Sequence, residues 1–195
     1  MSKRSGRGER VWGRRKRGVG TREVRQRFLI VCEGEQTEPH YFRAFQVPGL
    51  VIKIYPVNER TVGLIKEADR LNAEDDYDQV WCVFDRDDFP ADHIHQAINL
   101  AKRYEFGVAF SNQAFELWYH LHFAYHNTTI TRRDYCDQLS RRFGQKYVKN
   151  SMKMYDELLP HQETAIRNAE RLLNSYTPRQ PTHDDPSTTM SLLRS

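Results

Sequence analysis

The sequence contains few cysteines, and they lack the spacing of a disulfide framework or a zinc site. Only three cysteines occur among the 195 residues, an odd number, and no two of them form a CxxC pair. A disulfide-rich scaffold needs more cysteines, and a structural zinc site needs closely spaced ligand pairs. The cysteine content therefore argues against both classes. A reducing compartment, the cytoplasm, is expected instead.

Long apolar segments are also missing. No run approaches the roughly 20 residues that cross a bilayer, and the opening residues MSKRSGRGER contain no apolar signal core. A phosphate-binding loop of the form GxxxxGK[ST] does not occur, so nothing in the chain predicts nucleotide hydrolysis. With 38% hydrophobic residues, the length suits one compact domain with a modest core.

Positive charge is concentrated near the N-terminus. Residues 1–27 hold 11 lysines and arginines against two acids, a net charge of +9, whereas the rest of the chain carries −5. The Gly/Arg-rich segment 1–25 is expected to be a flexible arm, because it cannot bury apolar surface. Its cations, represented by Arg14, Arg15, Lys16 and Arg17, would attract a phosphate backbone. The alternative is a solubilising terminus.

Short apolar runs alternate with helical patterns after the arm. Runs at 27–32, 51–57, 79–84 and 106–110 have the composition of buried strands. Helices are expected after Thr37, taken as an N-cap, up to Pro48, and over 61–74 and 92–104. This alternation predicts an α/β fold in which a four-stranded parallel sheet, of spatial order 2-1-3-4, lies between helices.

The remainder of the chain is predicted to be mainly helical. We expect an α/β core over 26–125, a helical extension over 126–176 with breaks near 127–130, 144 and 160, and a connector with a terminal short helix over 177–195. Three prolines within 177–186 favour an extended connector.

Acidic residues follow two of the predicted strands. Glu33 comes at the end of the first strand, and Asp85 and Asp87 come just after the third. Because these strands would be neighbours, their carboxyl ends meet at one edge of the sheet, and the three carboxylates should lie within roughly 8 Å of one point. Converging anions require a cation or a proton, and Mg²⁺ meets this need. The alternative is that these acids cap the next helices.

The same stretches resemble a known family. VCEGE and DRD resemble the Toprim pattern, and IVCEGEQTEPHYF, VFDRDDF and SNQAFELWYHLHF are similar to the RloB-like (AbiLii-like) proteins of bacterial restriction and abortive-infection loci. The resemblance covers about residues 26–125 and extends weakly to DPSTTM. It implies a Toprim-like fold and Mg²⁺-dependent (or Mn²⁺-dependent) cleavage of DNA or RNA in anti-phage defence. It also implies a separate AAA-type ATPase partner.

The resemblance assigns roles to individual acids. Glu33 matches the Toprim glutamate, a metal ligand or general acid/base, and Asp85 and Asp87 match the aspartate pair that holds Mg²⁺; these three are the predicted catalytic residues. Other acids have two open interpretations, as ligands of the metal site or as surface acids and helix caps: Glu35, Glu38, Asp88 and Glu116.

A basic, aromatic stretch could contact nucleic acid. Residues 140–155, SRRFGQKYVKNSMKMY, contain no acid and include Arg141, Arg142, Lys146 and Lys149. Such cations track a phosphate backbone while the interleaved aromatic rings stack on bases. The alternative is a solvated helical face with buried aromatics. His120 is expected to contact phosphate, relay a proton or simply belong to an amphipathic helix.

Three functional classes remain open on the sequence alone. The first is a metal-dependent nuclease, a hydrolase acting on phosphodiester bonds. The second is a module that binds metal and nucleic acid without cutting. The third, a receiver-like regulatory module, would need a lysine after a fifth strand, and no such pair is evident.

Overall fold

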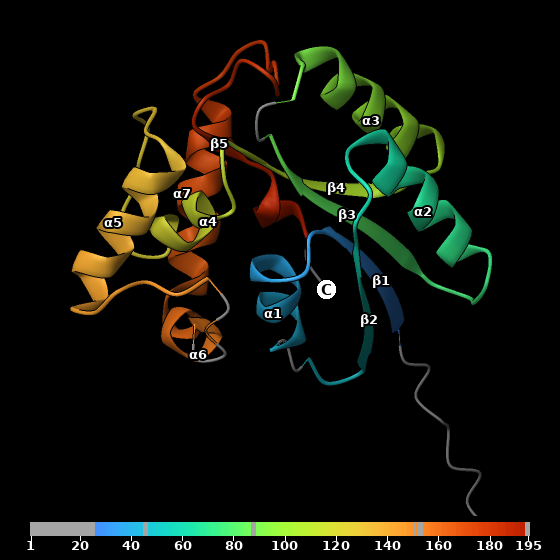
Figure 1. Cartoon of the computed structure of the whole chain (residues 1–195), viewed down its shortest axis with the longest axis horizontal. Coiled ribbons are helices and arrows are strands. Elements are labelled where there is room, and N and C mark those ends of the chain that lie inside the picture. Colours follow the sequence, from blue (N-terminus) through green and yellow to red (C-terminus); the bar gives the residue numbers. More distant parts are fainter. Residues whose placement is uncertain (1–25, 45–46, 87–88, 150, 152–153, 194–195) are drawn as a thin grey trace, which may run out of the picture.

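Five strands form one mixed sheet in the part of the chain that the structure describes. The computed structural model describes residues 26–44, 47–86, 89–149, 151 and 154–193. The sheet order is β2-β1-β3-β4-β5 (Figure 1). The strands are β1 (Gln26–Glu33), β2 (Leu50–Val57), β3 (Gln79–Asp85), β4 (Gly107–Asn112) and β5 (Ser187–Thr188). The first four are parallel, and β5 is antiparallel to β4.

The predicted α/β class is confirmed, and the number of strands is corrected. All four expected strands are present, parallel, and in the expected order. The prediction of a four-stranded, wholly parallel sheet is wrong, because β5 adds an antiparallel edge. The two residues of β5 are too few to show the alternation of apolar and polar side chains by which a strand is predicted from sequence. The edge is held instead by long-range contacts: Ser111 Oγ lies 3.0 Å from Thr188 Oγ1, and the Phe110 amide donates to Thr189 Oγ1 at 2.8 Å.

Helices cover both faces of the sheet. On one face, α2 (Val62–Asn72) and α3 (Ala91–Arg103) pack in the cluster that contains Leu29 and Val31 of β1. On the other face, α1 (Thr37–Arg43), α4 (Glu116–Leu121) and α7 (Gln162–Asn174) pack in the cluster that contains Ile30 and Cys32 (Figure 1). Successive side chains of β1 therefore enter opposite cores, as expected of a central parallel strand.

Two details of α1 differ from expectation. The helix begins at Thr37 but follows Gln36 at the N-cap position, where no side chain makes a capping hydrogen bond. The Thr37 side chain is instead buried. The helix also ends at Arg43, before the predicted limit at Pro48.

The C-terminal half contains further short helices packed beside α4. α5 (Arg132–Phe143) begins with a capping box between Thr131 and Asp134, and Gly144, whose φ is +66°, is its C-cap. α6 (Met154–Leu158) and the 3-10 helix η1 (Leu159–His161) lead into α7. Both α5 and α7 contact α4. The expected breaks near 127–130, at Gly144 and at Pro160 agree with these bounds.

The proline-rich segment after α7 returns to the sheet. Asn112, fully buried, donates from Nδ2 to the backbone oxygens of Asp184 at 3.0 Å and Pro181 at 3.4 Å. Asn112 thus ties β4 to the C-terminal segment. The predicted terminal helix is reduced to a single 3-10 turn, η2 (Met190–Leu192), preceded by β5. No helix in the described ranges has the length and apolar composition needed to cross a membrane.

Candidate functional site

A pocket of about 460 Å³ opens at the carboxyl ends of β1 and β3. It is lined by the turn after β1, the segment after β2, the end of β3, the first residues of α4 and α5, and the segment after α5. We call it the carboxylate pocket. Its charged lining consists of five acids and three cations: Glu33, Glu35, Glu38, Asp85, Glu116, Arg60, Arg132 and Lys149.

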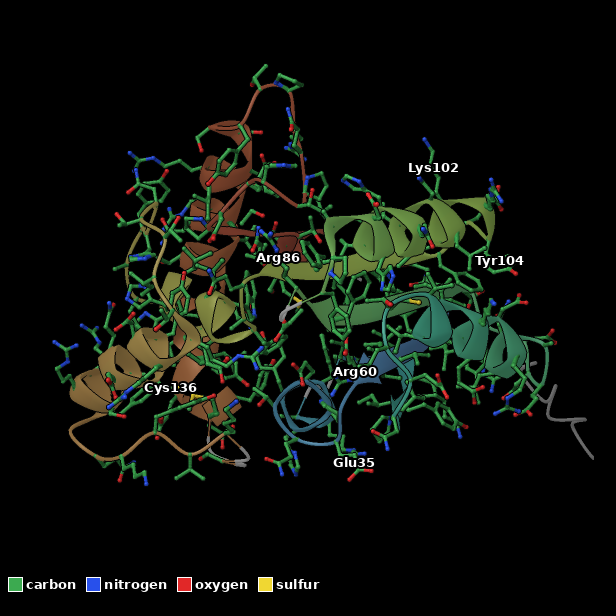
Figure 2. All side chains as sticks on the ribbon, turned by 45° about the horizontal axis from the view of Figure 1, so that its top comes forward. Glu35, Arg60, Arg86, Lys102, Tyr104 and Cys136 are labelled. Carbon is green, nitrogen blue, oxygen red and sulfur yellow. The ribbon has the colours of Figure 1, made fainter. Side chains whose placement is uncertain are left out.

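The turn after β1 depends on a glycine. Gly34 has φ +85°, in the left-handed region that favours glycine, and its amide donates to the Val57 oxygen at 3.1 Å. This turn leaves Glu33 at the strand end and starts α1 so that Glu38 lies in its first turn. Glu35 is exposed at the outer surface of the same turn (Figure 2).

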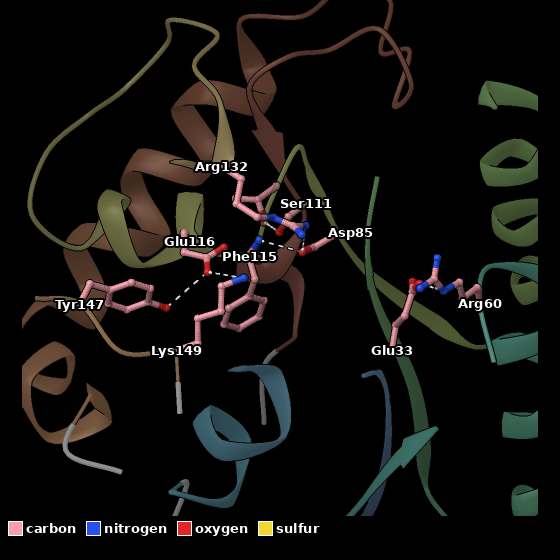
Figure 3. Close-up of polar contacts among 10 residues, drawn as sticks. Glu33, Arg60, Asp85, Ser111, Phe115, Glu116, Arg132, Tyr147 and Lys149 are labelled. Atoms are coloured by element: carbon pink, nitrogen blue, oxygen red, sulfur yellow. Dashed lines mark hydrogen bonds and ion pairs between the residues drawn. The ribbon is translucent and has the colours of Figure 1, made fainter. Parts of the chain in front are cut away.

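Asp85 is held through one of its two carboxylate oxygens. It is the last residue of β3, and its side chain is 12% exposed. Its Oδ2 accepts from the Phe115 amide at 3.1 Å and from Arg132 Nη2 at 3.2 Å (Figure 3). Its Oδ1 is buried without a hydrogen-bond partner among the described residues. Burial, and then the charge of Glu38, raises the pKa of Asp85 well above its ordinary value, against the opposing effect of Arg132.

Two glutamates complete the acidic side of the pocket. Glu116, the first residue of α4, has a side chain only 2% exposed; Tyr147 donates to its Oε1 at 3.5 Å and Lys149 Nζ lies 3.7 Å away (Figure 3). Burial raises the pKa of Glu38 to about 7, with contributions from the negative charges of Glu116 and Glu33. The acids therefore repel one another through a partly desolvated space.

Glu33 lies on the other side of the pocket. Its Oε1 is 3.9 Å from Arg60 Nε, and its side chain is 13% exposed. In Figure 3 the Glu33 carboxylate points toward Arg60, whereas Asp85 points toward Phe115 and Arg132. Among the described residues, no group of three His, Cys, Asp or Glu side chains could hold a metal ion. Asp87 and Asp88 lie outside the described residues, so the predicted convergence of Glu33, Asp85 and Asp87 stays a prediction.

The donors in the pocket match the chemistry of Mg²⁺. This ion prefers carboxylate oxygens, is commonly held by one or two of them, and keeps several waters. Asp85 Oδ1 is buried and has no hydrogen-bond partner among the described residues, and burial and repulsion act against the negative charge of Asp85 in the absence of a cation. Asp85, with Glu116 or Glu38 beside it, would hold the ion, and waters or a phosphate would complete its coordination.

The predicted basic stretch divides between two places. Lys149 lines the carboxylate pocket, whereas Arg141 and Arg142 line a second cavity with His120, and Lys146 is exposed and lines neither. His120 lies 2.6 Å from Gln138 Oε1, and burial and the neighbouring His126 lower its pKa. His120 is thus placed away from the lining of the carboxylate pocket.

The aromatic residues of the basic stretch pack inward. Phe143 lies against Phe123 with ring centroids 5.6 Å apart, Tyr147 is 8% exposed, and Tyr155 packs against Tyr41 at 5.8 Å. This packing favours the interpretation in which the rings are buried rather than available to stack on bases. The expected cations Arg14, Arg15, Lys16 and Arg17 lie outside the described residues.

Sequence reasoning missed two cations of the pocket. Arg60 follows β2, so the rule that parallel strands end at one edge could have included it. Arg132 is the first residue of α5, and only the docking of that helix brings it to Asp85, 47 positions away in sequence. No local pattern signals this contact.

The fold and the pocket define an α/β protein with a carboxylate-rich site at the carboxyl edge of its parallel strands. Residues 28–194 match the family model described as RloB-like protein, so the chain belongs to the RloB-like family. This confirms the family resemblance and extends it through the helical half. The comparisons with curated proteins and with solved structures found no match.

Proposed function

We propose that this chain is a Mg²⁺-dependent nuclease of the Toprim type that cleaves the phosphodiester backbone of DNA or RNA. The observation that carries the proposal is Asp85. This carboxylate at the end of β3 is 12% exposed, lines the pocket together with Glu33, Glu38 and Glu116, and has one oxygen, Oδ1, without a hydrogen-bond partner among the described residues. The order 2-1-3-4 of the parallel strands supports the Toprim relation, because β1 and β3 are then neighbours.

Each group in the pocket has a role in this proposal. When bound, Mg²⁺ activates a water molecule and neutralises charge on the phosphate. Asp85 and Glu116 would hold the ion, and Glu33 would act as a further ligand or as a general acid/base. Glu38, whose pKa of about 7 is close to neutral pH, is suited to take up or release a proton. Mn²⁺ would occupy the same oxygen ligands.

The proposed biological setting rests on the family resemblance. RloB-like proteins suggest a role in anti-phage defence, with an AAA-type ATPase as partner and cleavage that depends on it. A cytoplasmic location is supported by the cysteines, since Cys32, Cys82 and Cys136 are all free thiols. Cys32 and Cys82 are buried, and burial raises their pKa, as expected of structural thiols.

A second candidate is a module that binds metal and nucleic acid without cutting. It is favoured by the ion pairs of the pocket, since Glu33, Asp85 and Glu116 each have a basic side chain within 4 Å. A pocket already neutralised in this way could hold phosphate without catalysis.

The variant Asp85→Asn tests the nuclease proposal. It removes one charge and keeps the side-chain volume, so the metal-free protein should melt at the same temperature or a few degrees higher, because repulsion is relieved. When the Mg²⁺ concentration is about ten times its Kd, the free energy of unfolding of the unmodified protein should rise by about 1.4 kcal/mol. This corresponds to an increase of roughly 3–5 °C in Tm. The variant should lose most of this shift, and cleavage should fall by at least about 100-fold.

The assay follows nicking of plasmid DNA and cutting of RNA, in Mg²⁺ and Mn²⁺, with the ATPase partner present. Asp92→Asn is the matched control, because Asp92 is exposed in the first turn of α3 and does not line the carboxylate pocket. Full cleavage by Asp85→Asn without its Mg²⁺-dependent shift would refute the catalytic-metal assignment. Metal binding without cleavage of either substrate by the unmodified protein would establish the binding module.

A further inference from the structure

Three ion pairs in the carboxylate pocket share one asymmetry. Arg60 lies 3.9 Å from Glu33, Arg132 lies 3.2 Å from Asp85, and Lys149 lies 3.7 Å from Glu116. In each pair the acid is much less exposed than its partner: the acidic side chains are 13%, 12% and 2% exposed, whereas the basic side chains are 66%, 39% and 44% exposed. The acids are therefore fixed in the wall of the pocket, and the cations reach toward them from solvent.

These pairs are held weakly. The distances at Glu33 and Glu116 are longer than a hydrogen bond, so the attraction there is mainly Coulombic. An exposed basic side chain gains little from a single ion pair, because water screens the charge and the long side chain loses freedom. At Asp85, Arg132 donates to Oδ2, the oxygen that also accepts from the Phe115 amide, and Oδ1 has no hydrogen-bond partner among the described residues. Within each of these pairs, the contribution of the basic side chain to stability is therefore small.

A divalent ion and the basic side chains would compete for the same carboxylates. An ion bound through Asp85 Oδ1 stands close to the guanidinium on Oδ2, and like charges at such a distance repel. Arg132 and Lys149 would then turn from the acids while remaining attached to the pocket rim through α5 and the segment after it. A phosphate that approaches the ion meets both side chains, and the planar guanidinium binds two phosphate oxygens at once.

We propose that Arg132 and Lys149 are exchangeable cations: they neutralise Asp85 and Glu116 in the metal-free protein, and they bind the phosphodiester of the nucleic acid once those acids hold a divalent ion. The inference rests on the proposed function for the identity of the ion and the substrate. It adds that the same side chains oppose metal binding and favour substrate binding. If the ion pair with Arg132 only positioned Asp85, it would favour metal binding, and its loss would weaken metal binding.

Arg132→Gln should change metal affinity and oligonucleotide affinity in opposite directions. Removal of the competing cation should tighten Ca²⁺ or Mg²⁺ binding roughly twofold to fivefold, the factor expected for a single exposed ion pair. The same change should weaken binding of a short fluorescent DNA or RNA oligonucleotide in Ca²⁺. It should also lower the slope of log affinity against log salt by about one, the loss of one phosphate contact. Calorimetry and fluorescence anisotropy measure these effects without cleavage.

The neighbouring residue supplies the control. Arg133→Gln removes the same charge one position along α5, from a side chain that is 91% exposed, pairs with Asp137 and does not line the pocket. It should leave metal affinity and the salt slope unchanged. Arg132→Lys retains the charge without the planar fork, so metal affinity should stay near that of the unmodified protein while oligonucleotide affinity falls. If Arg132→Gln folds poorly, Arg132→Lys tests the exchange in its place.

The outcomes separate this inference from the nuclease proposal. If Arg132→Gln weakens metal binding, or strengthens it without any loss of oligonucleotide binding, the exchange is refuted, whether or not the protein cleaves. If the opposite shifts are found but the unmodified protein cuts neither DNA nor RNA with the ATPase present, the exchange stands and catalysis fails. If the unmodified protein binds no divalent ion, both proposals fall.

Discussion

Glu38 is expected to gain or lose its proton near neutral pH. Its ordinary pKa of 4.5 rises to about 7 in the folded protein, so the folded state keeps a proton that the unfolded chain releases. Stability of the metal-free protein should therefore decrease as pH rises from about 4.5 to about 7, by on the order of 1–2 kcal/mol once the partial exposure of the side chain is allowed for. Asp85 acts in the same direction.

Urea unfolding at several pH values without metal measures this dependence. Glu38→Gln should reduce the slope, whereas Glu35→Gln, which changes the exposed acid of the same turn, should leave it intact. Because metal ligands must be ionised, the stabilisation by Mg²⁺ should grow as pH rises through 7. An unchanged slope in Glu38→Gln would show that the proton is held elsewhere.

At the scale of elements, the attachment of β4 to the C-terminal segment is predicted to support both the fold and the site. Asn112→Ala removes two donations and leaves the Asp184 and Pro181 oxygens without this partner, at a cost of about 1–3 kcal/mol. Tm should fall by roughly 3–10 °C. The response to Mg²⁺ should weaken too, since the turn after Asn112 presents the Phe115 amide to Asp85.

Thermal unfolding with and without Mg²⁺ measures both effects. Asn174→Ala is the control, because Asn174 is an exposed residue at the end of α7 that accepts a hydrogen bond from Arg179. Equal losses of Tm in the two variants would mean that the contacts of Asn112 add nothing to stability.

The same elements show how far the sequence predicts the fold. The four parallel strands could be predicted because each is a short apolar run between helical patterns, and their order follows from the connections that such units allow. β5 could not be predicted, because its two residues gain their structure from β4, 77 positions away at Ser111 and Thr188. Helix ends were less well predicted, as at Arg43.

The candidate site was predictable to a similar degree. Acids that follow strands mark the edge of a parallel sheet, and the structure places Glu33, Glu38, Asp85 and Glu116 in one pocket there. The cations that face them depend on how α5 docks, which no local pattern encodes. The part of the prediction that concerns Asp87 and Asp88 lies outside the described residues.

At the scale of the whole molecule, the basic arm is predicted to contribute non-specific affinity. Residues 1–25 lie outside the described part of the chain, and the prediction depends on their charge alone. Their removal should weaken nucleic-acid binding for all sequences and flatten its salt dependence, because cations contact phosphates rather than base edges. Anisotropy titrations at several salt concentrations test this. Equal affinity and slope with and without the arm would support the solubilising role.

The composition of the carboxylate pocket also has a consequence for protein synthesis. Its acids Glu33 and Asp85 leave the ribosome before Arg132 and Lys149, and the cations reach the pocket only after the helical half has been translated and docked. A chain that terminates early would expose mutually repelling acids without Arg132 and Lys149, the two side chains proposed to bind phosphate in the pocket. On the nuclease proposal, we therefore expect incomplete translation products to leave the nucleic acids of the cell uncut, and only the full-length protein to cleave them.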